Sequence, residues 1–217
     1  MKRLLSLLIL TTLLAASTAM AQTSQVTLLL QSGTQHLLRN DYEGPPNSLC
    51  LSNLIGGQVP PGSQFLWYEE APPRYRPSVT RVLDGGWGPA GTTVLTRGKA
   101  FWIRIPPQGG LVASSQYAVT FSGEIPTNAT TVHLEPGYNT YGYPYPVNQY
   151  WTNTQVAKSL PNGSMLMVWQ SGMLTFQGYP KTRGGWSGGP PVLTPGQGVF
   201  VSLGSAVATN ILEPRPY

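Results

Sequence analysis

Three tyrosines at alternate positions, Tyr141, Tyr143 and Tyr145, have the residue type and spacing of a ligand-stacking surface. In an extended segment alternate side chains point to one face, so the three rings would lie in a row. Asn148 and Gln149 follow them and add amide groups. Aromatic rings stack on the apolar faces of sugars, and amides hydrogen-bond sugar hydroxyls, so this segment is the candidate carbohydrate-binding site. In the alternative interpretation, the segment is an edge strand whose tyrosines pack on a half-buried surface.

Glycoside hydrolysis needs two carboxyl groups, one of them held as a proton donor. Glu69, Glu70 and Asp84 are the candidates for such a pair. The matching stretch about 100 residues later carries no carboxylate, as is typical of exposed hairpin positions that tolerate either charge. A glycoside hydrolase-like enzyme is therefore the third alternative, and we expect a protein that is not an enzyme.

Nucleophilic and metal chemistry have few residues to use. The chain has two histidines, His36 and His133, and one cysteine, Cys50. We identify no Ser placed in a nucleophile elbow and no His, Cys, Asp and Glu cluster with ligand spacing. We expect no metal and no cofactor. Cys50 either packs as a small apolar side chain in residues 48–55 or bridges to another chain, and the sequence leaves both open.

The first residues have the pattern of an export signal. Lys2 and Arg3 precede an apolar run over residues 4–16, and small residues end at Ala21. This pattern predicts a signal peptide over residues 1–21, with cleavage before Gln22 and delivery to the periplasm, the cell envelope or the exterior. No run approaches the roughly 20 apolar residues that span a bilayer, so we expect no membrane span.

Composition limits the class of partner. Without Lys2 and Arg3 the chain has 11 cationic and 8 anionic side chains, a net charge of +3. The cations are scattered singly, whereas a nucleic-acid surface needs a dense basic face, so a nucleic-acid partner is not expected. Only 10% of residues are charged, and 25 glycines and 21 prolines are typical of short strands joined by many turns.

One series of motifs occurs twice, about 100 residues apart. The recurring features are Trp67 with Trp169, Trp87 with Trp186, and residues 94–103 with 192–201. Large rings at corresponding places favour a packing role in a repeated fold. The repeat predicts two related units, over residues 22–126 and 127–217.

Alternating apolar residues predict strands in both units, for example at 26–30, 101–105, 117–121 and 165–169. Two short helices are expected, over residues 48–55 and 152–160, the second capped by Asn153. The predicted fold is all-β, with two tandem units of about five strands and one short helix each.

Several of these motifs carry a family resemblance. Residues 134–139 read Leu-Glu-Pro-Gly-Tyr-Asn, Gly185-Trp186 follows, and residues 193–201 read Leu-Thr-Pro-Gly-Gln-Gly-Val-Phe-Val. This order resembles a β-rich domain of uncharacterised secreted bacterial proteins of the Verrucomicrobia and Planctomycetes type. Residues 31–35 of the first unit lack the aromatic residue and the Asn of the opening motif. The resemblance implies export and a β fold, and it assigns no activity.

Together these patterns predict a non-catalytic secreted or cell-envelope protein that acts by structural assembly or by binding a protein or a surface. A polysaccharide or another envelope protein is the expected partner, and self-association is a further expectation. A carbohydrate-binding module is the alternative function, with the tyrosine segment as its site.

Overall fold

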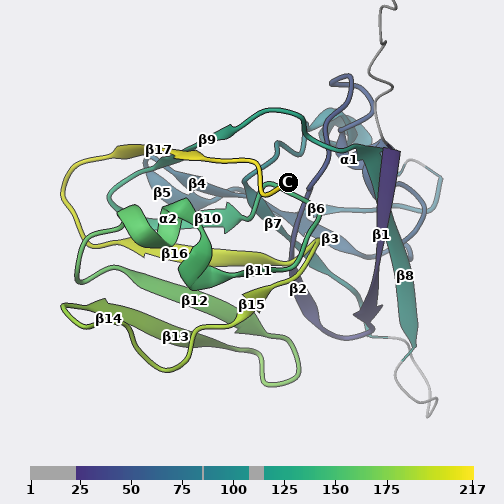
Figure 1. Cartoon of the computed structure of the whole chain (residues 1–217). Coiled ribbons are helices and arrows are strands. Elements are labelled where there is room, and N and C mark those ends of the chain that lie inside the picture. The colour runs from purple at the N-terminus through teal and green to yellow at the C-terminus, as the bar shows by residue number, and fades with distance from the viewer. Residues whose placement is uncertain (1–22, 85, 108–114) are drawn as a thin grey trace, which may run out of the picture.

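The computed structural model describes residues 23–84, 86–107 and 115–217, and the predicted signal peptide lies outside these residues (Figure 1). The fold is all-β, built from short antiparallel strands with two short α-helices. Within the described residues no helix has the length and hydropathy needed to cross a membrane. The predicted boundary between residues 126 and 127 falls in a segment without strand, between β8 and β9.

The first half runs from residue 23 to residue 124. Its elements are β1 (Thr23–Gln31), β2 (Gln35–Arg39), α1 (Leu51–Leu54), β3 (Gln64–Leu66), β4 (Tyr68–Glu70), β5 (Pro73–Tyr75), β6 (Val79–Thr80), the 3₁₀ helix η1 (Gly88–Thr92), β7 (Ala100–Arg104) and β8 (Gln116–Glu124). One sheet has the order β2-β7-β3-β6, while β1 and β8 form a two-stranded ribbon and β4 and β5 a hairpin. Figure 1 shows the ribbon of β1 and β8 at one side of the molecule.

The second half runs from residue 130 to residue 213. Its elements are β9 (Thr130–Leu134), β10 (Gly137–Gly142), β11 (Gln149–Tyr150), η2 (Trp151–Asn153), α2 (Gln155–Ser159), β12 (Met165–Gln170), β13 (Thr175–Thr182), β14 (Gly185–Trp186), β15 (Val192–Leu193), β16 (Gly198–Leu203) and β17 (Thr209–Glu213). Its main sheet has the order β10-β16-β12-β13-β14, and β9 pairs with β17. The first and last strands pair in each half, and in each main sheet the second strand lies beside the penultimate one.

The pairing register defines corresponding positions in the two sheets. Leu66 lies opposite Trp102 in the first half, and Met167 lies opposite Phe200 in the second. Two residues onward from Leu66 and from Met167, Tyr68 corresponds to Trp169, and the hairpin pairs Tyr68–Tyr75 and Trp169–Phe176 agree with this.

The expected correspondence of Trp67 with Trp169 is therefore wrong by one residue, and Trp67 corresponds to Val168. Neighbouring residues of a strand face opposite sides of the sheet, so a slip of one residue changes the face. Trp67 packs against the core of the first half, whereas Trp169 packs against side chains between the halves.

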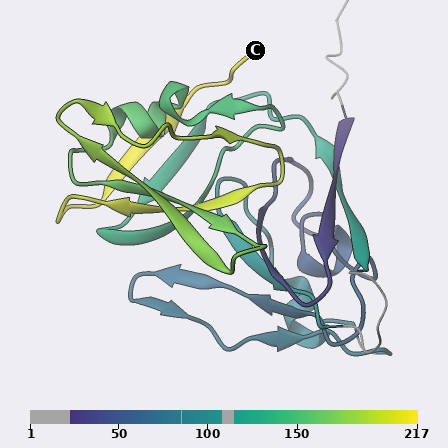
Figure 2. The same ribbon diagram turned by 90° about the horizontal axis from the view of Figure 1, so that it is seen from below.

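In the part of the chain that the structure describes, buried apolar residues form three groups. Each half has its own core, and these cores include Trp87 in the first half and Trp151 in the second. Trp186 is half-buried and packs against the second core. The third group joins the halves and contains Leu37, Tyr68, Ala100, Trp102 and Phe200. In Figure 2 the blue hairpin of β4 and β5 lies beside the green and yellow strands of the second half, and β4 is in contact with β10.

Both helices are shorter than predicted. The first covers only Leu51–Leu54, and the second begins after Thr154, whose side chain accepts a hydrogen bond from the backbone N–H of Ala157 at 3.0 Å. Thr154 is thus the N-cap in place of the predicted Asn153. The buried Glu213 carboxylate accepts the backbone N–H groups of Gln155 and Val156, and these bonds fasten α2 to the last strand.

Candidate functional site

The predicted tyrosine platform is not exposed. Tyr141, Tyr143 and Tyr145 are 0%, 1% and 0% exposed. The ring of Tyr141 packs edge-on against Trp151 with centroids 5.9 Å apart, and the Tyr145 hydroxyl hydrogen-bonds the carbonyl of Glu213 at 3.0 Å. These rings fill the core of the second half, so the expectation that they stack on a sugar is wrong.

The two amide residues of that prediction lie apart from this core. Asn148 is exposed, and Gln149 is half-buried in β11, where it pairs with Leu193 of β15. Through this pairing the backbone of Gln149 joins β11 to β15. The five predicted residues therefore do not form one exposed surface.

The three candidate carboxylates have separate surroundings. Glu69 accepts hydrogen bonds from Arg74 and from Arg76, which lower the pKa of its carboxyl. Glu70 forms an ion pair with Lys99 at 2.9 Å and accepts the Thr140 hydroxyl at 2.9 Å, a contact between the halves. Because its pKa is lowered, the Glu69 carboxyl is a poor proton donor at neutral pH.

Asp84 is exposed in the turn between β6 and η1, and its side chain forms no ion pair with the residues that the structure describes. The histidines are also occupied. His36 Nε2 contacts the Gln31 backbone N–H and the Thr34 hydroxyl, and His133 contacts Glu135 and Asn210. Among residues 23–84, 86–107 and 115–217, no group of three or more His, Cys, Asp and Glu side chains has the arrangement of a metal site.

Cys50 is half-buried, and its thiol donates to the backbone carbonyl of Asn47 at 3.1 Å. It also pairs through its backbone with Val94. The thiol is therefore neither in the apolar core nor joined to another cysteine in this chain.

An aromatic cleft lies at the junction of the two halves and has a volume of about 250 Å³. We call it the junction cleft. The residues that line it are Gln35, Leu66, Tyr75, Trp102, Trp169 and Phe176. The first half supplies four of them, from β2, β3, β5 and β7, and the second half supplies two from the β12–β13 hairpin. The junction cleft exists only because the two sheets pack together.

The rings of the junction cleft hold one another in fixed directions. The centroids of Trp102 and Trp169 are 5.0 Å apart with the rings nearly perpendicular, and Trp169 and Phe176 are also 5.0 Å apart. Trp102 is buried, but Tyr75 is 50% exposed and Phe176 is 37% exposed. Edge-to-face packing thus anchors the inner rings while two outer rings remain open to solvent.

One hydrogen bond ties the junction cleft together across the halves. The indole N–H of Trp169 donates to the backbone carbonyl of Gln35 at 2.7 Å, so this bond does not use the Gln35 side-chain amide. Burial raises the pKa of the Tyr75 phenol, so its hydroxyl stays protonated at neutral pH. The cleft therefore combines ring faces with an amide and a phenol, which are groups that can hydrogen-bond neutral hydroxyls.

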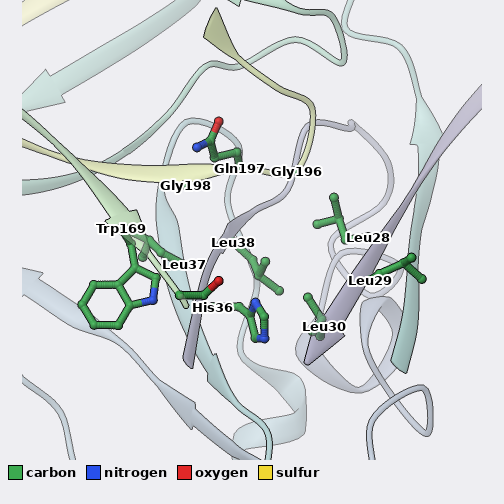
Figure 3. A pocket seen from close by; sticks show the side chains of 11 residues that line it. Leu28, Leu29, Leu30, His36, Leu37, Leu38, Trp169, Gly196, Gln197 and Gly198 are labelled. Carbon is green, nitrogen blue, oxygen red and sulfur yellow. The ribbon is translucent and has the colours of Figure 1, made fainter. Parts of the chain in front are cut away.

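Trp169 also borders a second cavity, of about 170 Å³ (Figure 3). In Figure 3 Leu28 and Leu30 of β1 and Leu38 and His36 of β2 surround one space, beside the backbone of Gly196–Gly198. Leucine side chains and occupied polar groups line this cavity. It offers fewer features for recognition than the junction cleft.

Sequence reasoning missed the junction cleft, although one signal in the sequence points to it. An aromatic pair with a spacing of seven residues occurs in both halves, as Tyr68 with Tyr75 and as Trp169 with Phe176. In each half the pair faces across a hairpin. The spacing alone places two rings side by side, but only the packing of the halves brings both pairs together.

Comparison with known protein families, with curated proteins and with solved structures gave no match. The resemblance to secreted bacterial β-rich proteins therefore stays a prediction. The geometry of the site is the basis for a functional proposal.

Proposed function

We propose that this chain is an exported, non-catalytic binding protein of the cell envelope or exterior, and that the junction cleft binds a sugar ring of a polysaccharide. The observation that carries the proposal is the open pair Tyr75 and Phe176, held by Trp102 and Trp169 beside the Gln35 amide. Sugars present an apolar face and a rim of hydroxyls, which complement ring faces and amides. Carbohydrate binding is retained from the sequence, but on residues different from the tyrosines first predicted.

We further infer that the two halves derive from one repeated unit and act as one scaffold. Their matching strand order and matching hairpin aromatic pairs support this inference. Ligand sites are common where two domains meet, because each side positions part of the lining rigidly. A site at this junction depends on both units.

Retention on insoluble cellulose, chitin and bacterial cell-wall polysaccharide tests the junction cleft. The variant with Tyr75→Ala and Phe176→Ala removes the two open rings, and we expect it to lose retention with a Tm close to that of the parent. Stacking of one sugar on an exposed ring contributes about 1 kcal/mol, so two rings change affinity roughly tenfold or more.

The matched control is Tyr150→Ala, since Tyr150 is 61% exposed and outside the junction cleft. We expect this control to bind as the parent does. Equal retention by the double variant and the parent would exclude the junction cleft as the binding site.

A second candidate function, assembly with other copies or envelope proteins, rests on a different observation. Met173 and Leu174, in the turn between β12 and β13, are 70% and 60% exposed, and Leu174 has a positive φ of 50°. A non-glycine residue in this conformation is strained, and such strain is often retained at functional sites. Light scattering of the parent and of Met173→Ser/Leu174→Asn tests this role, which predicts concentration-dependent assembly that only the parent shows.

A further inference from the structure

A separate pocket lies within the first half and has a volume of about 300 Å³. We call it the Trp67 pocket. The residues that line it are Phe65, Trp67, Arg76, Pro77, Val79, Ala90 and Thr93. Most of the wall is apolar, and one guanidinium and one hydroxyl stand in it. An apolar pocket with a few polar groups is the usual form of a small-ligand site.

Trp67 is larger than the fold requires at its position. Val168 corresponds to it in the second half, where it is 4% exposed and fills the core. Trp67 is only half-buried, and its ring lies beside Phe65 with centroids 6.1 Å apart. Its indole N–H makes no hydrogen bond to any residue that the structure describes. The position thus offers a ring face and a free donor.

Arg76 adds positive charge to the same pocket. Its backbone N–H donates to the carbonyl of Trp67 at 2.9 Å, which sets the two side chains side by side. Its Nε and Nη2 donate to Glu69, and Arg74 donates to the other oxygen of the same carboxylate. Two guanidinium groups sharing one carboxylate leave a net charge of +1, and Nη1 of Arg76 has no partner among the described residues.

We infer that the Trp67 pocket binds an acidic sugar residue, a uronic acid, with its ring on Trp67 and its carboxylate on Arg76. A guanidinium is the preferred partner of a carboxylate, and its N–H groups lie in one rigid plane that suits bidentate binding. The Thr93 hydroxyl supplies a partner for a ring hydroxyl. The surplus of one positive charge matches one carboxylate. This site is distinct from the junction cleft and does not depend on the function proposed there.

Calorimetric titration of the full chain with tetragalacturonate and with neutral galactotetraose tests the inference. We expect the acidic tetrasaccharide to bind the parent in preference to the neutral one, with an affinity that falls as salt is added. Arg76→Gln removes the carboxylate partner and should weaken acidic binding about tenfold or more, as loss of a hydrogen bond between charged groups does.

Arg74→Gln is the matched control. Arg74 and Arg76 both pair with Glu69, and their side chains are 64% and 62% exposed, but only Arg76 lines the pocket. Both variants lose one charge, so a general electrostatic attraction would weaken equally in both. We expect Arg74→Gln to change acidic binding by less than about threefold, because a charge outside the pocket acts only through a screened field.

Trp67→Val, which copies the second half, should also abolish acidic binding, while Phe176→Ala in the junction cleft should leave it intact. Failure of the parent to bind tetragalacturonate, or equal losses in Arg74→Gln and Arg76→Gln, would overturn the inference. Loss of acidic binding in Phe176→Ala would assign the acidic sugar to the junction cleft instead. Thermal melts of each variant verify that a loss of binding is not a loss of the fold.

Discussion

The two halves share a strand order, yet they differ most where corresponding residues meet. Arg39 lies opposite Ala100 in the first sheet, and Gly142 lies opposite Gly198 at the corresponding place in the second. Arg39 packs directly on Gly142, where a Cβ would lie 2.4 Å from the Arg39 Cδ. Likewise a Cβ on Gly198 would lie 2.5 Å from the Cβ of Ala100.

Contacts between corresponding positions are the mark of a twofold arrangement, in which residues near the axis touch their own counterparts. Trp102 and Phe200 also meet, with centroids 6.3 Å apart. At the Arg39 and Gly142 position one half carries a long cation and the other carries no side chain. Two copies of either half would bring together two arginines or leave a void, so the two halves are complementary at this position.

Arg39 makes the difference between the halves an electrostatic one as well. It is fully buried, forms an ion pair with Asp41 at 2.7 Å and donates to the Thr194 carbonyl at 3.1 Å in the second half. Asp41 in turn accepts the backbone N–H of Gly196. Burial raises the pKa of Asp41 to about 6, against the opposing effect of Arg39. This buried pair joins the two halves.

The largest expected effect comes from breaking that pair. Arg39→Met should lower the free energy of unfolding by about 3–5 kcal/mol, because it leaves the Asp41 carboxylate buried without a cation. The pKa of Asp41 then rises further, so the loss should be larger at pH 8 than at pH 5, since a raised carboxyl pKa contributes stability that is lost as pH rises. Urea unfolding at both pH values measures this.

The double variant Arg39→Met/Asp41→Leu serves as the control for that prediction. It removes both charges, so it should recover most of the lost stability, as apolar replacements of buried ion pairs do. A single variant as stable as the parent at pH 8 would mean that the pair does not hold the halves together.

A smaller effect is expected from making the two halves more alike. Gly142→Ala places a methyl group against the Arg39 side chain and should cost about 1–3 kcal/mol, the range for overpacking. Gly172→Ala is the control, since no atom lies within 4 Å of a Cβ there. Thermal unfolding of the two variants should differ clearly. Equal melting temperatures would show that Arg39 moves aside freely and that the complementary fit is loose.

Much of the architecture follows from local patterns in the sequence. Alternation of apolar residues identified the strands that contain Val119, Ile103 and Met167, and turn residues marked the break between the halves. Strand alternation depends only on neighbours in the chain, so a single sequence carries it. The all-β class is therefore predictable.

Whether a given face of a strand is buried or exposed is not predictable in the same way. Tyr141, Tyr143 and Tyr145 alternate as exposed rings would, but β16 pairs with β10, which contains Tyr141, and Trp151 packs against the Tyr141 ring. Those partners are distant in sequence or depend on a helix whose position the sequence leaves open. The junction cleft was missed for the same reason, because its rings come from two hairpins about 100 residues apart.

The smallest expected effect separates the histidines of the two halves by their response to pH. Burial lowers the pKa of His36 in the first half. Hydrogen bonds that the His133 ring donates to Glu135 and, with a smaller effect, to Asn210 raise the pKa of His133 in the second half. The unfolded chain binds more protons than the folded chain at His36, and fewer at His133, so the two contributions to stability change in opposite directions with pH.

For His36 the contribution is present above the unfolded pKa near 6.5 and is lost as pH falls through the lowered folded value. For His133 it is present below about 6.5 and is lost as pH rises through the raised folded value. His36→Gln should therefore make the protein less sensitive to acid, and His133→Gln should remove stability only on the acid side. The His133 effect should stay below about 1 kcal/mol because the pair is exposed. Unfolding free energies of the parent and both variants from pH 5 to pH 8 measure these slopes, and slopes of the same sign would refute the contrast between the two halves.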